Sequence, residues 1–158
     1  ERLTEQLLPL KVTLLNCDNS TQIVCLCTLV ALKALLCSSE VTLLNLCNKE
    51  KAIREGEFFD LTYANLEGIV FNEHKQYAFY RKAGKELLFI VVNFDDKPAA
   101  PAVKIPTHAF DYLGIPFKES YKAKDLLTGN TETLTMAPDQ CTPILLQGHG
   151  AKILKIKL

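Results

Sequence analysis

The sequence has no tryptophan, a single methionine and no net charge, with 18 basic and 18 acidic side chains among its 158 residues. Because the charges balance on both sides of Gly56, neither part presents the basic surface that nucleic acid requires, and we expect no nucleic-acid partner. The chain is also too short for a complete (β/α)8 barrel, which needs roughly 250 residues. The length therefore leaves little room for a large catalytic scaffold.

A hydrophobic run of membrane-spanning length is also missing. The longest apolar stretch, Ile23–Cys37, has 15 residues and includes Lys33, whereas a bilayer span needs about 20. We expect a buried helix here and no membrane partner. The alternative is a signal-peptide core, but a positive leader before it and a small-residue cleavage site after it are both lacking. The first residue is Glu1 rather than Met, which indicates an excised fragment or a processed product.

Cysteine is scarce outside the first third of the chain. Five of the six cysteines are Cys17, Cys25, Cys27, Cys37 and Cys47, and the sixth is Cys141. This is not the even spread of a secreted disulfide scaffold. Zinc is disfavoured because, in a helix, the Cys25 and Cys27 side chains would point about 200° apart. Free buried thiols are favoured over zinc or disulfides, which indicates a reducing compartment, cytoplasmic rather than periplasmic, and no metal or other cofactor.

Catalytic motifs are missing as well. Asp95 and Asp96 are adjacent and so diverge, whereas glycosidic acid/base chemistry needs two carboxyls facing one bond. Asp60 lies among aromatic residues, but a hydrogen-bonded Asp at a strand end is the more common arrangement. The histidines, His74, His108 and His149, fall in three apparent turns without metal-binding spacing. We expect no catalytic residue.

The sequence also contains no recognisable motif for a catalytic nucleophile or for phosphate binding. The serines are Ser20, Ser38, Ser39 and Ser120, and none stands in a G-x-S-x-G elbow. The seven glycines are scattered, and Gly148-His149-Gly150 is typical of a hairpin turn. The tyrosines, Tyr63, Tyr77, Tyr80, Tyr112 and Tyr121, could stack on a sugar, but core packing explains them equally well. No substrate-binding residue is assigned.

Residues 1–56 and residues 57–158 differ in periodicity. Leu-rich segments of helical length precede Gly56, which is expected to end the last helix in the left-handed C′ role. After it come short segments rich in aromatic and β-branched residues. The expected strands are Phe58–Tyr63, Ile69–Phe71, Gln76–Arg81, Glu86–Phe94, Ala102–Ile105, Tyr121–Leu126, Glu132–Thr135, Pro143–Leu146 and Ala151–Lys157, with one helical turn at Thr107–Leu113. The chain is predicted to be α+β, a helical segment followed by an antiparallel β-sandwich.

Five segments carry a family resemblance. They are LLNLCNKEKAIREGEFFDLTYAN (Leu43–Asn65), QYAFYRKAGKELLFIVVNF (Gln76–Phe94), VKIP (Val103–Pro106), DLLTG (Asp125–Gly129) and PILLQGHGAKILKI (Pro143–Ile156). In this order they resemble the last barrel helix and the C-terminal β-domain of the α-amylase superfamily of glycoside hydrolases, with Asn93-Phe94 as the most characteristic pair. The resemblance implies that the sandwich has Greek-key connections. Residues 1–40 match no part of the family's late barrel.

The resemblance also implies a role. The family's nucleophilic Asp, general-acid Glu and stabilising Asp lie far upstream of the last barrel helix, and their motifs do not occur here. The chain is therefore expected to be a non-catalytic ancillary domain whose partner is the missing catalytic barrel, with apolar residues of one sheet around Phe58, Phe59, Phe89 and Val91 shielding that barrel. α-Glucan is a further candidate partner. Two alternatives are an autonomous carbohydrate-binding sandwich, which the lack of tryptophan disfavours, and an unrelated α+β interaction domain.

Overall fold

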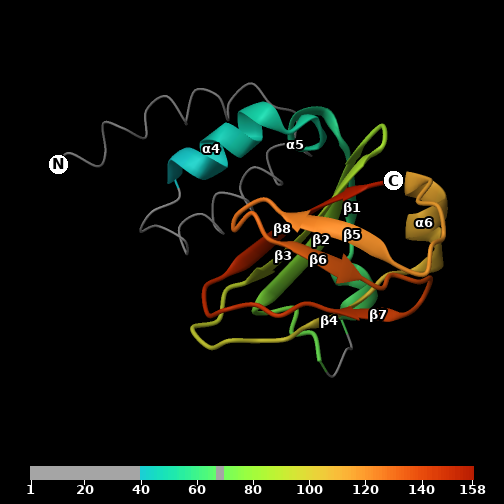
Figure 1. Cartoon of the computed structure of the whole chain (residues 1–158). Coiled ribbons are helices and arrows are strands. Elements are labelled where there is room, and N and C mark those ends of the chain that lie inside the picture. The colour runs from blue at the N-terminus through green and yellow to red at the C-terminus, as the bar shows by residue number, and fades with distance from the viewer. Residues whose placement is uncertain (1–39, 67–69) are drawn as a thin grey trace.

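The computed structural model describes residues 40–66 and 70–158, and most of its regular structure is antiparallel sheet (Figure 1). The described elements are α4 (Glu40–Lys49), α5 (Lys51–Glu55), β1 (Glu57–Asp60), the 3₁₀ helix η1 (Thr62–Asn65), β2 (Gln76–Ala83), β3 (Glu86–Asn93), β4 (Ala102–Lys104), α6 (Thr107–Leu113), β5 (Tyr121–Asp125), β6 (Thr131–Leu134), β7 (Cys141–Pro143) and β8 (Ala151–Lys157). Strands joined by a few short helices confirm the α+β prediction.

The strands form one large sheet and one small sheet. The large sheet has six strands in the order β1-β2-β3-β8-β5-β6, and β4 pairs with β7 in a separate two-stranded sheet. All pairs are antiparallel. The strands predicted at Gln76–Arg81 and Glu86–Phe94 are confirmed as β2 and β3. They form a hairpin that turns at Gly84, whose φ of 60° suits a residue without a Cβ atom. Greek-key connections are not established by this strand order and stay a prediction.

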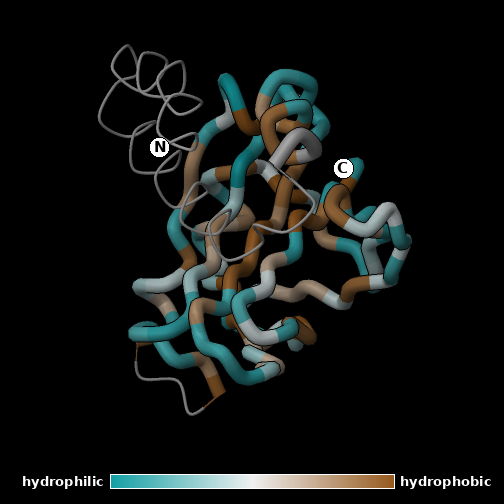
Figure 2. The backbone as a smooth tube through the Cα atoms, turned by 90° about the vertical axis from the view of Figure 1, so that its left-hand side faces the viewer, coloured by the Kyte–Doolittle hydropathy of each residue, from teal (hydrophilic) through white to brown (hydrophobic). Residues whose placement is uncertain are grey.

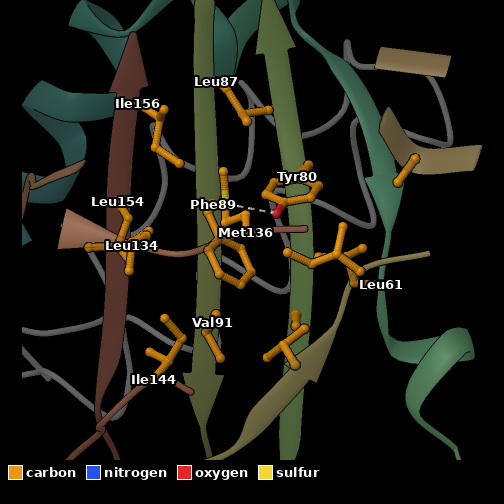
Figure 3. Packing of buried hydrophobic residues seen from close by; sticks show 14 of the residues in the cluster. Leu61, Tyr80, Leu87, Phe89, Val91, Leu134, Met136, Ile144, Leu154 and Ile156 are labelled. Carbon is orange, nitrogen blue, oxygen red and sulfur yellow. Dashed lines mark hydrogen bonds between the residues drawn. The ribbon is translucent and has the colours of Figure 1, made fainter. Parts of the chain in front are cut away.

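One face of the large sheet forms the main core. Strands β2, β3 and β8 contribute Tyr80, Phe89 and Leu154, which lie side by side with exposed fractions of 0%. The small sheet and α6 cover this face, and Met136 accepts a hydrogen bond from the Tyr80 hydroxyl at 3.4 Å between O and Sδ (Figure 3). The buried phenol thus keeps a polar partner within the core.

The opposite face of the large sheet packs against α4 and α5 and forms what we call the helix-side core. Its buried members include Leu43 and Ala52 from the helices and Leu88 and Ile90 from β3. Figure 1 shows these helices on the side of the sheet away from β4 and β7, and in Figure 2 hydrophobic colour runs through the strands between the two layers. Cover on both faces explains why β3 is a continuous apolar run without the alternation of a half-exposed strand.

Three predicted strands differ from the observed ones. The strand expected to reach Tyr63 ends at Asp60, because the Asp60 carboxylate accepts the Thr62 amide at 2.8 Å and turns the chain into η1. Val70 and Phe71 are not in a strand, and Ile69 lies outside the described residues. The strand expected at Pro143–Leu146 lies earlier as β7, and Leu146 forms only an isolated bridge with Ala99.

Gly56 ends α5 as predicted, but its conformation was wrongly predicted. Its φ and ψ of −71° and 150° are extended, not left-handed. Glycine is needed here because the backbone of α5 lies close to this position: a Cβ atom on residue 56 would lie 2.2 Å from the Ala52 carbonyl oxygen. The observed change from helix to strand falls at this residue, while the division into domains 1–56 and 57–158 stays a prediction.

Other predictions fall outside the described residues. These are the buried helix expected at Ile23–Cys37 and the free thiols expected at Cys17, Cys25, Cys27 and Cys37. Of the two cysteines that the structure describes, neither Cys47 nor Cys141 forms a disulfide, and Cys141 is exposed, not buried as expected. Within residues 40–66 and 70–158 there is no helix long and apolar enough to cross a bilayer.

Candidate functional site

The adjacent carboxylates of Asp95 and Asp96 lie in the turn that follows β3. Lys75 Nζ is 2.6 Å from Asp95 Oδ2. Hydrogen bonding from Lys75 holds the pKa of the Asp95 carboxyl well below its ordinary value. An ionised carboxylate of this kind lacks the raised pKa of a general acid, so the geometry supports the interpretation of a surface turn.

The three histidines lie on separate elements. His74 is in the turn before β2, His149 is in the turn before β8 with a φ of 49°, and His108 is on α6. Among the residues that the structure describes, no group of three His, Cys, Asp or Glu side chains could hold a metal ion. Asp60 ends β1 with the hydrogen bond described above, and Ser120 is an exposed residue just before β5.

The tyrosines divide into buried and exposed groups. Tyr80 and Tyr121 are in the main core, and Tyr77 is half-buried against Phe79 with ring centroids 5.5 Å apart. Tyr63 is 45% exposed and Tyr112 is 62% exposed. Only the last two are therefore placed at the surface to meet a ligand.

The four apolar residues that were expected to shield the barrel lie on one sheet as predicted, but on both of its faces, and their shielding role stays a prediction. Phe58 belongs to the helix-side core, whereas Phe89 and Val91 are buried in the main core, against which Phe59 packs. Neighbours in a strand point to opposite faces, so Phe58 and Phe59 cannot share one surface.

A polar network holds α5 against the large sheet. Arg81 of β2 donates from Nε to the Ala52 carbonyl at 3.1 Å and from Nη2 to the Ile53 carbonyl at 2.7 Å. The Arg81 residue is only 4% exposed, although it carries a full charge. Its planar guanidinium thereby satisfies two carbonyl groups of a short helix, which fixes both the position and the direction of α5.

Ionic contacts continue this network on the next strands. Lys155 Nζ of β8 lies 2.5 Å from Glu50 Oε2 and 2.8 Å from Glu86 Oε2. Glu86 also accepts the Ala52 amide at 3.3 Å. We call the four side chains of Glu50, Arg81, Glu86 and Lys155 the α5 network.

The protonation of the α5 network follows from these contacts. Burial acts to raise the pKa of Glu86, but the hydrogen bonds from Lys155 and from the Ala52 amide outweigh it and the pKa is lowered. Burial acts to lower the pKa of Lys155, but its hydrogen bonds to Glu50 and Glu86 outweigh it and the pKa is raised. Both groups are therefore charged at neutral pH and hold each other in that state.

A second cluster lies at the surface, on the main-core side. It consists of Phe59 of β1, Tyr63 of η1, and His108 and Tyr112 of α6, and we call it the aromatic cluster. The Phe59 ring centroid is 5.5 Å from that of His108, 5.8 Å from that of Tyr112 and 6.3 Å from that of Tyr63. The Tyr63 hydroxyl and His108 Nε2 are hydrogen-bonded. Partly buried Phe59 thus supports three exposed rings from two other elements.

Charged groups flank the aromatic cluster. Burial, followed by the nearby Asp60 carboxylate, raises the pKa of Tyr63. Next to His108, the Thr107 hydroxyl donates a hydrogen bond to Asp139, which also pairs with Lys104 at 4.0 Å. The Thr107 hydrogen bond is the main reason that the pKa of Asp139 is lowered. The rings therefore have ionised hydrogen-bonding groups beside them.

All four members of the aromatic cluster are named in the sequence analysis, which does not predict that they lie together. Tyr63 and His108 are 45 positions apart. The sequence offered one indication of the cluster. Tyr63 and His108 each carry a polar atom on an aromatic ring, and neither occupies a core position in a regular pattern. The α5 network was not predicted, because Arg81 and Lys155 lie in predicted strands and no spacing in the sequence links them to Glu50 or Ala52.

Comparison of the sequence with protein-family models and with curated proteins finds no match. The fold, however, is similar to parts of solved glycosidase structures. A noncanonic maltogenic α-amylase, AmyB from Thermotoga neapolitana, matches with a TM-score of 0.55 and 14% identity over 74% of this chain and 24% of that chain. An Anoxybacillus α-amylase matches with a TM-score of 0.48 and 20% identity over 73% of this chain and 21% of that chain.

A β-L-arabinopyranosidase from Geobacillus stearothermophilus matches with a TM-score of 0.38 and 20% identity over 56% of this chain and 19% of that chain. This chain spans about a quarter or less of the length of each of these three structures. The match to AmyB shows that the fold of this chain is similar to one portion of that α-amylase.

Proposed function

We propose that this chain is the C-terminal β-domain, with Greek-key sandwich connections, of an α-amylase-like glycoside hydrolase acting on α-glucans, and that it supports the enzyme's catalytic barrel without taking part in catalysis. The fold likeness to one portion of an α-amylase supports this proposal. The observation that carries the supporting role is the α5 network, which fastens the helical segment to the sheet.

The α5 network is suited to fixing the orientation of α5 relative to the large sheet. A helix held only by apolar contacts can rotate or slide, because dispersion and hydrophobic contacts have little directionality. Arg81 instead fixes two successive backbone carbonyls of α5, and Lys155 fixes Glu50 at the junction between α4 and α5. In the parent enzyme, α4 and α5 would be the end of the barrel, and the β-domain would hold them in one orientation.

The two carboxylates nearest each other in this site are unsuited to glycosidic chemistry. Glu50 and Glu86 are bridged by the Lys155 ammonium, and the pKa of Glu86 is lowered, not raised. A retaining glycosidase needs a protonated acid and a free nucleophile on either side of the scissile bond. These carboxylates are occupied by a structural contact, and Glu50 is only 4% exposed.

Two experiments test this proposal. The isolated chain, incubated with soluble starch or maltohexaose, is expected to release no reducing sugar above a buffer blank, and turnover that scales with chain concentration contradicts the non-catalytic role. An antibody raised against the chain would also be used to purify the protein from its natural source. Peptide sequencing of the purified protein is expected to find a barrel with two Asp motifs and one Glu motif. A purified protein without barrel peptides would contradict the proposal that this chain belongs to such an enzyme.

A further inference from the structure

We propose that the β5–β6 end of the large sheet is a docking surface for an extended acidic segment of a partner protein, which adds a strand to β6. The surface lies on the face that carries α4 and α5, beyond β2 and β3, on which α5 packs. Two independent observations on neighbouring strands carry this inference, a row of exposed lysines and a free backbone edge. It does not depend on the proposed function.

Three exposed lysines share one face of the large sheet. Strand β5 alternates between buried and exposed residues, and its buried apolar residues belong to the main core. Lys122 and Lys124 therefore lie on the opposite face, the one that carries α4 and α5. Lys157 of β8 lies on this face too, two positions beyond Lys155 of the α5 network. We call the exposed side chains of Lys122, Lys124 and Lys157 the lysine row.

The sheet register brings these positive charges close together. Lys124 is directly opposite Lys155, and the next position along the same register places Lys122 beside Lys157. Like charges directly across a strand pair repel each other. Lys155 is neutralised within the α5 network, whereas among the described residues no ion pair involves the lysine row. A negatively charged partner would relieve this repulsion.

Strand β6 is an edge of the large sheet and has free backbone groups. The Asp125 amide donates to the Asn130 carbonyl at 2.8 Å, and hydrogen-bonded and non-hydrogen-bonded pairs alternate from there along the β5–β6 ladder. Thr131 and Thr133 occupy non-hydrogen-bonded positions, so their amides and carbonyls point away from β5. Both residues are exposed. An extended segment can therefore pair with this edge as a further strand.

The free edge and the lysine row lie within reach of one ligand. Thr131 is opposite Lys124 and Thr133 is opposite Lys122, on the same face of the sheet. A strand added to β6 would lie two strand spacings, about 10 Å, from β5. Because the threonine side chains between them are short, lysine and glutamate side chains can meet above them. Backbone pairing would supply affinity, and the lysine row would select acidic side chains at alternate positions.

A second copy of the chain and a nucleic acid fit this surface less well. Pairing of β6 with β6 of another copy would bring two lysine rows onto one face of a continuous sheet, where they repel each other. Single-stranded nucleic acid binds through aromatic stacking as well as through charge. Strands β5, β6 and β8 present no aromatic side chain on this face. An acidic peptide strand is therefore the occupant that the observations favour.

The test is fluorescence polarisation of a labelled peptide of alternating threonine and glutamate, titrated with the 158-residue chain. Saturable binding is expected, and the corresponding threonine–lysine peptide should not bind. The double variant Lys122→Gln, Lys124→Gln should raise Kd about tenfold, because it removes two of the charges that attract the peptide. Lys97→Gln is the matched control, since Lys97 is exposed in the segment that follows β3, and it should leave Kd within about twofold.

A second variant tests the backbone edge. Thr133→Pro removes an amide that points away from β5, so the β5–β6 ladder keeps its hydrogen bonds while strand addition is blocked. It should raise Kd about tenfold. Circular dichroism of each variant checks that the fold is kept. The lysine double variant changes only exposed side chains, so it tests the proposal even if Thr133→Pro unfolds.

Three outcomes would overturn the proposal. The first is no saturable binding of the acidic peptide at millimolar chain concentrations, or binding that neither variant weakens. The second is equally tight binding of an oligothymidylate, which makes the surface a general anion site. The third is self-association that Thr133→Pro abolishes without any peptide binding, which assigns the edge to a contact between copies. Starch turnover or missing barrel peptides would contradict the proposed function but leave this binding result intact.

Discussion

Lys155 Nζ lies 2.5 Å from Glu50 Oε2, which joins the last strand of the large sheet to the junction of two helices 105 positions earlier in the chain. The same ammonium lies 2.8 Å from Glu86 Oε2. One side chain thus connects both ends of the described structure, and its surroundings allow its contribution to be measured.

Replacing Lys155 by methionine should destabilise the fold. The substitution keeps the aliphatic packing but leaves the carboxylates of Glu50 and Glu86 close together without their cation. Breaking a buried ion pair costs about 3–5 kcal/mol. Because the Lys155 side chain is 34% exposed, solvent screening reduces the expected loss to about 1–3 kcal/mol. Urea unfolding measures it. Lys122→Met, at an exposed position of β5, is the control, and equal midpoints for both variants would contradict the role of the α5 network.

Stability should fall in acid, in part through Glu86. Its pKa is lowered in the folded state from the ordinary value of 4.5, so the unfolded chain binds more protons and stability rises with pH in this window. The contribution is complete above about pH 5 and is lost as pH falls through the folded pKa. Urea midpoints between pH 7 and pH 3 should therefore decline, and less steeply for Glu86→Gln. Parallel curves for the two proteins would show that Glu86 does not contribute.

Gly56→Ala should destabilise the protein, because the backbone of α5 leaves no room for a side chain at this position. Its Cβ atom would lie 2.2 Å from the Ala52 carbonyl oxygen, which is backbone and cannot rotate away. Overpacking of this kind costs about 1–3 kcal/mol. Gly84→Asn is the control, because no atom lies within 4 Å of its Cβ position and asparagine tolerates a φ of 60°. Thermal unfolding should show a clear decrease in Tm for Gly56→Ala and a smaller change for Gly84→Asn.

Asn93→Ala should loosen the end of β3. The Asn93 amide donates to the Lys97 carbonyl at 2.8 Å and to the Gln147 carbonyl at 3.0 Å, and its oxygen accepts the Asp95 amide at 3.2 Å. Since the residue is fully buried, leaving these groups without partners should cost about 2–3 kcal/mol. Calorimetry should therefore find Tm lowered by about 4–12 °C. Asn130→Ala removes an exposed side chain before β6, and a decrease of similar size there would contradict the prediction.

Strand periodicity was the most informative local signal. The β2–β3 hairpin and β8 were predicted within a few residues of their observed bounds, because long segments rich in β-branched and aromatic residues have few alternatives to sheet. The end of β1 was missed. Phe58 to Tyr63 keeps a strand-like pattern, but one local hydrogen bond from the Thr62 amide to Asp60 stops the strand.

The candidate sites were less accessible to sequence reasoning than the fold. Taken singly, Tyr63 and Tyr112 are explained by core packing and His108 by a position in a turn. Their meeting depends on α6 lying next to β1 and η1, which no spacing in the sequence encodes. The same holds for Arg81, whose two carbonyl partners lie 29 and 28 positions away.

The sequence by itself determined that this chain is α+β, that helix gives way to strand at Gly56, and that the residues after it form antiparallel strands. These properties follow from local periodicity and from the conformational limits of single residues. The tertiary structure decided which face each strand residue occupies, that Lys155 joins Glu50 to Glu86, and that four rings from three elements share one surface. Such relationships depend on register and layer packing, because a shift of one residue along a strand moves every side chain to the opposite face.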